Sequence, residues 1–541
     1  MTVIRRQFLP GGGLSQLLIG SAIAILIAPL PAAAQHRARL SKDIESQISG
    51  GSMATLRVIV QAPQSEVDRL AGTYGVRIAK RLDMGAVLEG TAQQFDRVAG
   101  DANVSALASD DTVASTMAIT TQSTGASQLW AGKSGNFGGL TGAGVVVGVV
   151  DSGISSHPDL KGRLVDSVDF IDPAGKVDGF GHGTHIAAII AGSGGGSRTL
   201  EGSAYVGMAP YAQLVSLRVL DGEGNGYVSS VIEAIEFAIK RKDRYKLRVL
   251  NISLGHAATS APADDPMAQA VERAVKAGIV VVASAGNFGK TEDGTPIVGA
   301  VVSPGDTPGA LTVGALNTRG TVVRDDDAVA SYSSRGPVGQ EGDPSGWEIK
   351  PDLVAPGNAI VSAGAPDSYL WNFFPDRRTF GPNGGTYLTL SGSSMAAAVV
   401  SGAVAQLLQA QPNLKPADVK FILQYTAQRL AGFGLIEQGA GSLNVPLAVA
   451  LAQTLSTGGG FDAAPDAVQI GGQAVEAGGV AFASKTLSAN ASGAEVWGNT
   501  IVWGSRDGVA GNTIVWGSRD GVAGNTIVWG SRDGVAGNTI V

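Results

Sequence analysis

Between about residues 129 and 455, short and largely apolar segments alternate with helical patterns, which leaves few folds open to this chain. The apolar segments are residues 145–150, 214–219, 248–253, 279–284 and 311–313, and helical patterns cover residues 229–240 and 266–277. Strands that are apolar on both faces and separated by helices are typical of a parallel sheet that is covered on both sides. We therefore predict an α/β fold with a mostly parallel sheet and helices on both faces. Its ligands should bind beyond the carboxyl ends of the strands.

Composition excludes several classes of protein. With 541 residues, of which 44% are hydrophobic and 16% charged, the chain is long enough for two or three globular domains. It has no cysteine, which excludes disulfides, thiolate metal sites and a cysteine nucleophile. The net charge is -7 and no run of lysine or arginine stands out, so we predict no nucleic-acid partner.

The N-terminus indicates export. Arg5 and Arg6 precede an apolar stretch at residues 14–30 and small residues up to Ala34, a pattern typical of a signal peptide (residues 1–34) that is cleaved after Ala34. A membrane anchor is the alternative, but the stretch is short and contains glycine and proline. The run of residues 5–9 resembles a twin-arginine signal. We predict a secreted, periplasmic or cell-surface protein without a stable membrane span in its mature chain.

A small unit follows the signal. Strand patterns at residues 56–61, 77–82, 86–89 and 104–107 and helical patterns at 65–74 and 93–99 give the order βαββαβ. This is the order of a ferredoxin-like sandwich. Residues 116–125 are rich in threonine and serine without apolar periodicity, so we expect an exposed linker where proteolysis concentrates.

The chain ends in a repeat. Gly-Asn-Thr-Ile-Val recurs from Gly498, Gly511, Gly524 and Gly537, with a period of 13 residues. Its strand-like and turn-like halves predict a β-rich tail within residues 456–541, either a stack of hairpins or a small solenoid. A partly ordered tail produced by repeat expansion is the alternative.

Three local signatures carry candidate chemistry. Asp151 ends a buried strand, His182 begins a predicted helix, and Ser394 lies at the start of an apolar helix, where backbone N–H groups favour negative charge. Taken singly, each signature is also typical of a turn or a helix cap. Together, in this order, they resemble the subtilisin-like (subtilase) serine proteases over about residues 129–455.

Further segments carry the same resemblance. They are Asn251-Ile252-Ser253-Leu254-Gly255, Ala285-Gly286-Asn287, Gly224-Asn225-Gly226, and residues 331–337 and 350–357. The resemblance implies that Ser394 attacks the peptide carbonyl, His182 transfers the proton, and Asp151 orients the imidazole. It makes Asn287 the oxyanion donor. It assigns protein or peptide substrates to a binding site formed by Ser253, Leu254, Gly255, Gly224, Asn225, Gly226, Ala285 and Gly286.

Two segments depart from the family pattern. Ala397, Ala398 and Val399 stand where the family usually has Ser or Thr and then Pro-His, so we expect a straighter nucleophile helix. Residues 193–205 do not reproduce the family's calcium loop, although Asp159 is kept, which leaves a structural calcium ion unsupported. No cofactor is required for the chemistry and no metal site is predicted. His185 follows His182 by three residues, and we interpret it as structural because no third ligand is near in sequence.

The unit at residues 35–120 resembles the inhibitory propeptide of these proteases, followed by a protease domain at residues 121–455. A folded pro-unit can template slow, long-range strand pairing and then occupy the cleft as the enzyme's own partner. We predict that the chain cuts itself between residues 112 and 127.

The sequence says little about substrate preference. We expect Val302 near the base of the substrate pocket and Phe288 at its mouth, which would favour small or apolar substrate side chains.

Two other classes compete with a protease. A degenerate protease fold could serve the repeat tail in adhesion, but all four of Asp151, His182, Ser394 and Asn287 are present. A lipase or esterase prefers Gly-x-Ser-x-Gly with the histidine last in the chain, and Ser394 fits neither feature.

Overall fold

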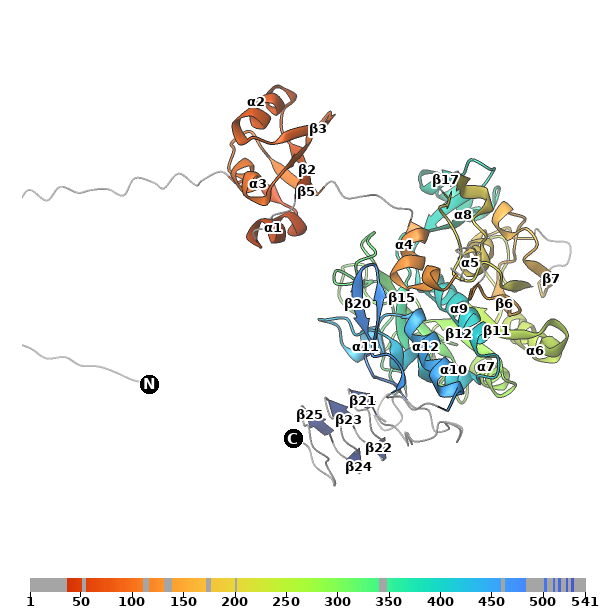
Figure 1. Ribbon diagram of the computed structural model, residues 1–541. Coiled ribbons are helices and arrows are strands. Elements are labelled where there is room, and N and C mark those ends of the chain that lie inside the picture. Colours follow the sequence, from red (N-terminus) through yellow and green to blue (C-terminus); the bar gives the residue numbers. More distant parts are fainter. Residues whose placement is uncertain are drawn as a thin grey trace, which may run out of the picture. The chain divides into compact units, whose positions relative to one another are not determined.

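The computed structural model describes residues 37–50, 55–109, 116–130, 139–171, 177–199, 202–339, 348–458 and 463–482, with five short strands of the repeat between 501 and 529. The chain divides after Thr112 into two compact units, which are described separately (Figure 1). The predicted signal peptide and twin-arginine motif lie outside the described residues.

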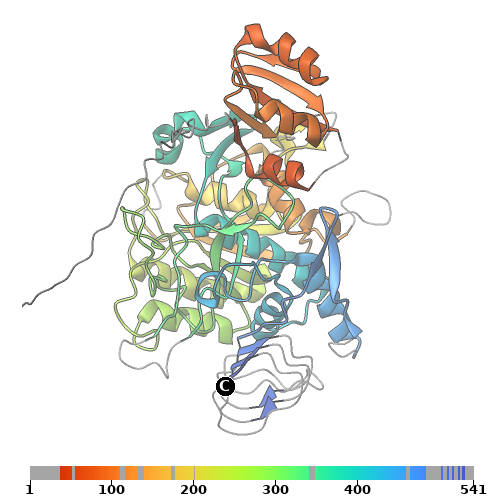
Figure 2. The same cartoon turned by 90° about the vertical axis from the view of Figure 1, so that its left-hand side faces the viewer.

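The N-terminal unit has its own sheet and helices (red to orange in Figure 2). The predicted elements occur in the predicted order: β2 (Leu56–Gln61), α2 (Gln64–Tyr74), β3 (Arg77–Leu82), β4 (Gly85–Gly90), α3 (Ala92–Ala99) and β5 (Ala106–Ser109). Two more, β1 (Arg39–Leu40) and α1 (Lys42–Ser49), were not predicted. The strand order is β1-β5-β2-β4-β3. Phe95 and Leu70 lie in its core without exposed surface.

The second unit is built on an eight-stranded sheet. Its order is β14-β13-β12-β11-β6-β10-β7, with β15 also paired to β13, and every pair is parallel except β13 with β14. The strands are β6 (Val146–Asp151), β7 (Leu164–Asp169), β10 (Gln213–Arg218), β11 (Leu247–Ile252), β12 (Val280–Ser284), β13 (Leu311–Asn317), β14 (Ala328–Val329) and β15 (Leu353–Pro356). The predicted mostly parallel sheet is confirmed.

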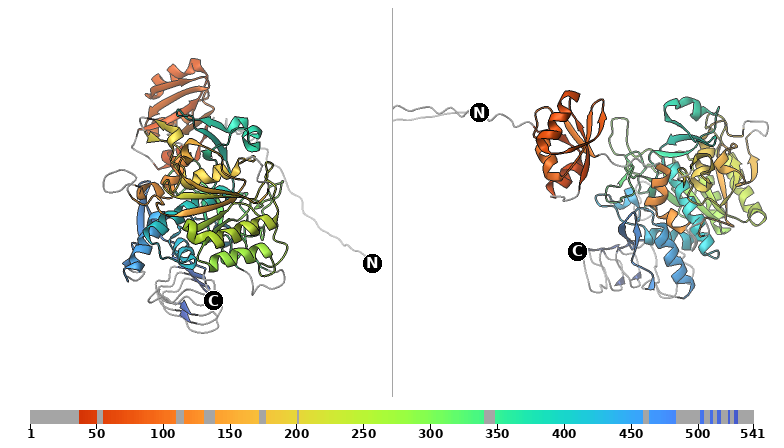
Figure 3. Two further views of the ribbon diagram at one scale, coloured as in Figure 1. Left: turned by 90° about the vertical axis from the view of Figure 1, so that its right-hand side faces the viewer. Right: turned by 45° about the horizontal axis from the view of Figure 1, so that its top comes forward.

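Helices cover both faces of this sheet. Val147 and Val149 of β6 pack in one cluster with α5 (His182–Ala191) and α9 (Ser393–Ala410), and Val146 and Val150 pack in another with α6 (Val228–Tyr245) and α7 (Pro266–Lys276). Figure 3 (left) shows α6 and α7 (yellow-green to green) side by side on their face. Successive side chains of a strand point to opposite faces, so a strand covered on both sides must be apolar throughout.

Smaller elements complete the second unit. They are η1 (Ala126–Leu129), η2 (Pro158–Leu160), η3 (Gly195–Ser197), β8 (Arg198–Thr199), β9 (Gly202–Ser203), β16 (Ile360–Ala363), α8 (Tyr369–Phe373), η5 (Pro375–Arg377), β17 (Arg378–Phe380), β18 (Thr386–Leu390), α10 (Pro416–Thr426), α11 (Leu435–Gln438), α12 (Val445–Ser456), β19 (Ala467–Ile470) and β20 (Gln473–Glu476). Of these, β16, β18 and β17 form a separate antiparallel sheet in that order.

The segment expected to be an exposed linker is instead a buried helix. Residues 116–123 form α4 (Thr116–Ser123), and Met117, Thr121 and Thr124 are each at most 2% exposed. The side chain of Arg324, itself 3% exposed, donates to the carbonyl of Ser123 at 2.8 Å. The interpretation as a linker was therefore wrong, and the predicted domain boundary at residue 120 falls inside this helix.

Helix α9 runs without interruption through Ala397, Ala398 and Val399, where the family usually has its proline. It is the one helix among the described residues that is long and apolar enough to span a membrane, and 83% of it is buried inside the protein. Its apolar character therefore belongs to the core of this unit.

The described strands of the repeat pair in parallel at the repeat's own period. Strand β21 (Ile501–Trp503) pairs with β23 (Ile514–Trp516), which pairs with β25 (Ile527–Trp529), so that each residue faces its own equivalent. The shorter β22 (Val509–Ala510) and β24 (Val522–Ala523) pair in the same way. Parallel pairing is the arrangement of a solenoid, since hairpins pair their strands antiparallel.

Candidate active site

The carboxyl ends of adjacent parallel strands bring the predicted residues to one edge of the sheet. Asp151 ends β6, Ser253 follows the end of the neighbouring β11, and Ala285 follows β12. Residues far apart in the sequence therefore meet where ligands are expected to bind in such sheets.

Asp151 and His182 form a hydrogen-bonded pair. The His182 Nδ1 atom lies 2.8 Å from Asp151 Oδ1 and 2.9 Å from Oδ2. The Asp151 carboxylate has no exposed surface and also accepts a hydrogen bond from the Ser152 backbone N–H at 2.8 Å. Because a carboxylate can only accept, Nδ1 carries the proton of this bond, and the second ring nitrogen, Nε2, is left as an acceptor.

Glycines set the close approach of the histidine helix to the strand end. A Cβ atom added to Gly183 would lie 2.1 Å from the Gly153 carbonyl oxygen. A side chain at this position would therefore push α5 away from the end of β6. Gly181 precedes the helix with a φ of 94°, and a Cβ there would meet the Ser368 hydroxyl at 2.3 Å. The glycines on either side of His182 thus place its ring against Asp151.

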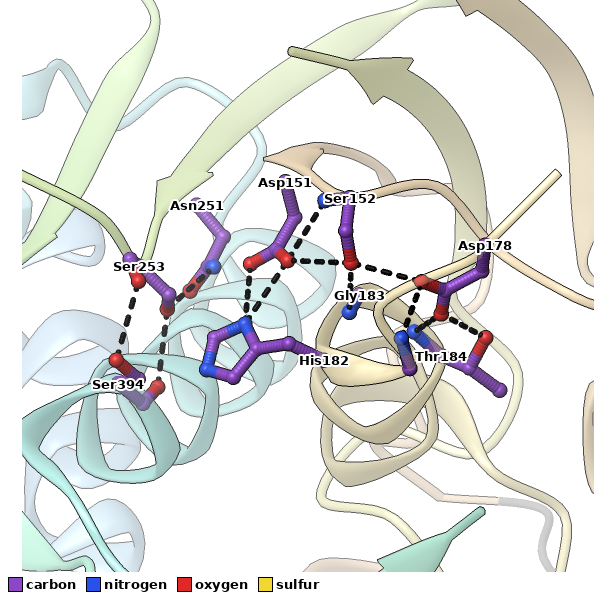
Figure 4. A network of polar contacts seen from close by, with 10 residues as sticks. Asp151, Ser152, Asp178, His182, Gly183, Thr184, Asn251, Ser253 and Ser394 are labelled. Atoms are coloured by element: carbon purple, nitrogen blue, oxygen red, sulfur yellow. Dashed lines mark hydrogen bonds and ion pairs between the residues drawn. The ribbon is translucent and has the colours of Figure 1, made fainter. Parts of the chain in front are cut away.

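Ser394 is the second residue of α9, on the other side of the His182 ring (Figure 4). Its hydroxyl donates to the Ser253 carbonyl at 3.1 Å, and the Ser253 hydroxyl donates to the Ser394 carbonyl at 3.0 Å. The Nε2 atom of His182 faces Ser394 in Figure 4, but the Ser394 hydroxyl is bonded to Ser253 and not to the imidazole. The structure thus brings the three predicted residues together, with the Ser394 hydroxyl turned toward a backbone carbonyl.

The predicted oxyanion donor, Asn287, is exposed and fixed by its neighbour. Its Oδ1 atom accepts from the Ser393 backbone N–H at 2.9 Å and lies 3.1 Å from the Ser393 hydroxyl. Ser393 is 1% exposed, and its hydroxyl accepts from the Gly286 N–H at 3.0 Å. With its oxygen held toward Ser393, Asn287 keeps its Nδ2 hydrogens for another acceptor.

A second carboxylate, Asp178, lies behind the first and was not predicted. It is 4% exposed, and its Oδ1 accepts from the Ser152 hydroxyl at 2.8 Å and from the Gly181 N–H at 2.7 Å. Its Oδ2 accepts from the backbone N–H of Thr184 at 2.8 Å and from the Thr184 hydroxyl. The Ser152 hydroxyl also lies 3.2 Å from Asp151 Oδ1, so this one group touches both carboxylates (Figure 4).

These charges act on the pKa of His182. Burial alone would lower the pKa of His182, but the negative charge of Asp151, the hydrogen bond to it and the charge of Asp178 together raise this pKa above its ordinary value. The pKa of Asp178 is raised because burial penalises its charged form more than its hydrogen bonds favour it. A raised pKa suits a histidine that takes up a proton during the reaction.

A pocket of about 410 Å³ opens beside His182. The predicted substrate-binding segments at residues 224–226 and 253–255 line it, together with apolar side chains that include Leu220, Val231 and Met267. Ala285, Gly286 and Asn287 are not among the lining residues of this pocket.

Val302 and Phe288, predicted at the base and the mouth of the pocket, are not among the lining residues of this pocket either. Val302 is 6% exposed, and its side-chain atoms lie within 3 Å of the Cβ positions that side chains at Gly255 and Gly286 would need. Val302 thus fills the space between these two segments. Phe288 is 61% exposed, and its place relative to a bound substrate stays a prediction.

Two metal sites were considered, a zinc-like pair with His185 and a calcium site with Asp159, and the described residues support neither. The Nε2 atom of His185 lies 3.0 Å from the Leu388 carbonyl oxygen, burial lowers its pKa to about 3, and the side chain has no exposed surface. Asp159 accepts from the Gly196 N–H at 2.6 Å and from the Tyr387 hydroxyl at 2.9 Å. Both Asp159 oxygens thus face protein donors, and the described residues contain no group of three or more acidic or histidine side chains suited to a metal.

A chain of polar side chains beneath Ser253 also escaped the sequence argument. The Ser401 hydroxyl donates to Asn251 Oδ1 at 2.9 Å, and Asn251 Nδ2 donates to the Ser253 hydroxyl at 2.8 Å. This chain of hydrogen bonds ties α9 to β11. A polar Asn251 inside an apolar strand was the one available signal, because a buried amide requires partners.

Comparison with known proteins agrees with this geometry. Residues 142–442 match the subtilase family, Peptidase_S8. The chain belongs to the subtilase family. By class this subtilase is a serine endopeptidase.

Similar proteins carry names of the same class. The subtilase is 38% identical over 313 residues to serine protease AprX of Bacillus subtilis, a match that covers 56% of this chain and 66% of AprX. It is 34% identical over 311 residues to subtilisin Savinase of Lederbergia lenta, with 57% of this chain and 92% of Savinase covered. Subtilisin E of Bacillus subtilis is 36% identical over 312 residues, with 57% and 67% covered. The chain thus spans about two thirds of AprX and of subtilisin E.

Proposed function

We propose that the chain is an exported endopeptidase that hydrolyses protein or peptide substrates with Ser394, His182 and Asp151 and matures by cutting itself. The observation that carries the proposal is the Asp151–His182 pair, at 2.8 Å, facing Ser394 at the start of a helix beside an open pocket. The names of the subtilisins and of AprX, whose sequences cover this region, support the same activity.

The chemistry follows from the protonation of His182. Ser394 Oγ bonds to the scissile carbonyl carbon as its proton moves to His182 Nε2, which is free to accept because Nδ1 donates to Asp151. The imidazolium then gives this proton to the leaving amine as the C–N bond breaks. Water hydrolyses the acyl-enzyme by the reverse proton path. Asp151 stays ionised throughout and stabilises the positive charge on the ring.

Asn287 and the start of α9 would stabilise the oxyanion. The Nδ2 group of Asn287 is available because Oδ1 is held by the Ser393 N–H at 2.9 Å. Backbone N–H groups at the start of α9 add partial positive charge at the same place. Donors fixed before the reaction cost no reorganisation when the negative charge develops.

The N-terminal unit would act as the propeptide. It is a compact unit of its own that ends near Thr112, which suits a segment released as a whole. Cleavage between Met117 and Ser127 would require buried α4 to leave the core. We therefore expect the cut to lie N-terminal to Met117, with α4 kept by the mature enzyme.

The test combines covalent labelling with intact mass. A fluorophosphonate probe is applied to the exported wild type, to Ser394→Ala and to Ser391→Ala. Ser391 is a matched control because it is an exposed serine three residues earlier, and its hydroxyl accepts from the Ala359 N–H rather than facing the imidazole. We expect the probe to label the wild type and Ser391→Ala, and to leave Ser394→Ala unlabelled.

The masses test maturation in the same samples. We expect wild type and Ser391→Ala to appear without the N-terminal unit, and Ser394→Ala to keep it. Labelling that persists in Ser394→Ala would end the assignment of the nucleophile. A Ser394→Ala protein of the short size, made without added protease, would contradict self-cleavage.

A further inference from the structure

A row of aromatic rings leads away from the catalytic histidine. Phe180 lines the pocket with His182, and their ring centroids are 6.2 Å apart. Phe180 stacks on Tyr369 at 5.8 Å and 27°, and Tyr369 stacks on Phe373 at 5.6 Å and 12°. We call Phe180, Tyr369 and Phe373 the aromatic ladder.

The outer part of the ladder is exposed to solvent. Tyr369 is 46% exposed and Phe373 is 61% exposed. Tyr227, which lines the same pocket as Phe180, is 79% exposed. Contiguous exposed apolar side chains on a soluble protein mark binding surfaces more often than isolated ones do.

The ladder is fixed relative to the catalytic site. The backbone N–H of Tyr369 donates to the Gly179 carbonyl at 2.8 Å, and that of Leu370 donates to the Phe180 carbonyl at 3.0 Å. These bonds tie α8 to the loop that leads into His182. Trp371, 8% exposed, anchors α8 from beneath, and its carbonyl accepts from the Arg378 guanidinium at 2.8 Å. Rings held this firmly can bind a ligand without first being ordered.

We propose that the aromatic ladder binds apolar side chains of an extended polypeptide substrate, outside the pocket next to the scissile bond. This inference rests on the proposed endopeptidase function. The occupant follows from continuity, because Phe180 belongs to both the pocket and the ladder, so a chain seated in the pocket continues onto the rings. Three steps of 5.6–6.2 Å from His182 to Phe373 span at most about five residues of extended chain.

Aromatic faces select for apolar partners. Ring-to-ring and ring-to-aliphatic contacts are favourable, and Tyr369 stacks on both of the other rings of the ladder. The ladder would therefore favour substrates with leucine, phenylalanine or tyrosine about one to five residues beyond the pocket. Substrates too short to reach it would not be affected by it.

The experiment compares long and short substrates in three proteins. They are the wild type, the double variant Tyr369→Ala/Phe373→Ala, and Phe380→Ala as a matched control. Phe380 lies on the adjoining β17, is 68% exposed, and its ring contacts Trp371 and not the ladder. The substrates are a chromogenic tetrapeptide and quenched peptides extended by five residues on the N-terminal or the C-terminal side, each extension carrying leucines or serines.

We expect the double variant to lose about tenfold in kcat/KM on one leucine-extended peptide, mainly through KM, as the loss of two aromatic contacts predicts. Its kcat/KM for the tetrapeptide and for the serine-extended peptides should stay within twofold of wild type, and Phe380→Ala should match wild type throughout. The side of the extension that responds gives the direction of the ladder along the substrate.

Equal losses on short and long peptides, or no loss on either leucine extension, would overturn the proposal. Ladder variants that change only self-processing would also overturn it, since the occupant would then be the N-terminal unit. The tetrapeptide reports separately on the proposed function, which fails if the wild type does not cleave it. In that case, binding replaces catalysis as the test of the ladder. Fluorescence anisotropy measures how tightly the same leucine-extended peptides bind Ser394→Ala with and without the ladder substitutions.

Discussion

Asp178→Asn tests how the carboxylate behind Asp151 acts on the Asp151–His182 pair, which we propose to be catalytic. Asp178 accepts four hydrogen bonds, from the Ser152 hydroxyl, the Gly181 N–H, and the N–H and hydroxyl of Thr184. An asparagine has one acceptor oxygen, so its amide group must face either the Gly181 N–H or the Thr184 N–H. In both orientations a buried backbone donor meets another donor.

Two consequences follow, with different magnitudes. Leaving one buried donor unsatisfied and losing charge-assisted bonds should cost about 2–4 kcal/mol of unfolding free energy. Burial already disfavours the Asp178 charge, which offsets part of this cost. For catalysis, the Asp178 charge helps to raise the pKa of His182, so neutralising it should lower that pKa. We expect kcat to fall by about tenfold or less, because Asp151 keeps its own bond to the ring.

The assay is a pH profile of kcat/KM on a short peptide. Activity requires neutral His182 and is lost as the pH falls through its raised pKa, so the acid limb of Asp178→Asn should move to lower pH. Thr184→Val is the matched control, since it removes one donor to Asp178 and leaves the charge in place. An unmoved acid limb in Asp178→Asn, or an equal shift in Thr184→Val, would refute an electrostatic role for Asp178.

Three further substitutions test the site and its support. Asn287→Leu should lower kcat by about 10²–10³ with little change in KM, and an unchanged kcat would remove Asn287 from the oxyanion site. Burial raises the pKa of Asp306 to about 6, so its contribution to stability is lost as the pH rises from about 4 to 6. Asp306→Asn should therefore raise the free energy of unfolding at pH 8 by up to about 3 kcal/mol, and not at pH 3.5. Calorimetry that gives equal changes at both pH values would contradict this. Asp352 pairs with buried Lys350 at 2.9 Å and with Lys420 at 3.0 Å, so Asp352→Asn should cost about 3–5 kcal/mol in denaturant unfolding, and a loss below 1 kcal/mol would show that the lysines find other partners.

The sheet could be predicted because local sequence determines its strands, and the three candidate catalytic positions could be predicted because their signatures, taken together and in order, resemble a family pattern. Strands such as Val146–Asp151 must be apolar on both faces, and the first charged residue after such a run marks the strand end. The glycines on either side of His182 mark a backbone that approaches another segment closely. The strand order, by contrast, depends on pairings between distant segments that no local pattern specifies.

The burial of α4 could not be predicted from its polar composition. The Thr121 hydroxyl donates to the Met117 carbonyl at 3.2 Å, and the Thr124 hydroxyl donates to the Thr120 carbonyl at 2.8 Å. Hydroxyls that bond one turn back satisfy themselves within the helix, so the helix can be buried although its residues are polar. Its carbonyl end is bonded by Arg324, about two hundred residues later in the chain. The polar composition of residues 116–125 was therefore wrongly read as exposure to water, because the threonine hydroxyls form their hydrogen bonds within the helix.

The hydrogen bond of the Ser394 hydroxyl suggests how substrate binding would activate the proposed nucleophile. Rotation of this one hydroxyl would separate the resting arrangement from the reactive one. In the structure this hydroxyl donates to the Ser253 carbonyl at 3.1 Å, and that carbonyl belongs to the segment that we assign to substrate pairing. A substrate whose backbone N–H pairs with the same carbonyl would compete with the Ser394 hydroxyl for it. Displaced, the hydroxyl has His182 Nε2 as its next acceptor, since Nδ1 is engaged by Asp151. Binding and activation of the nucleophile would then be one event, and the Asp151–His182 pair would need no movement of its own.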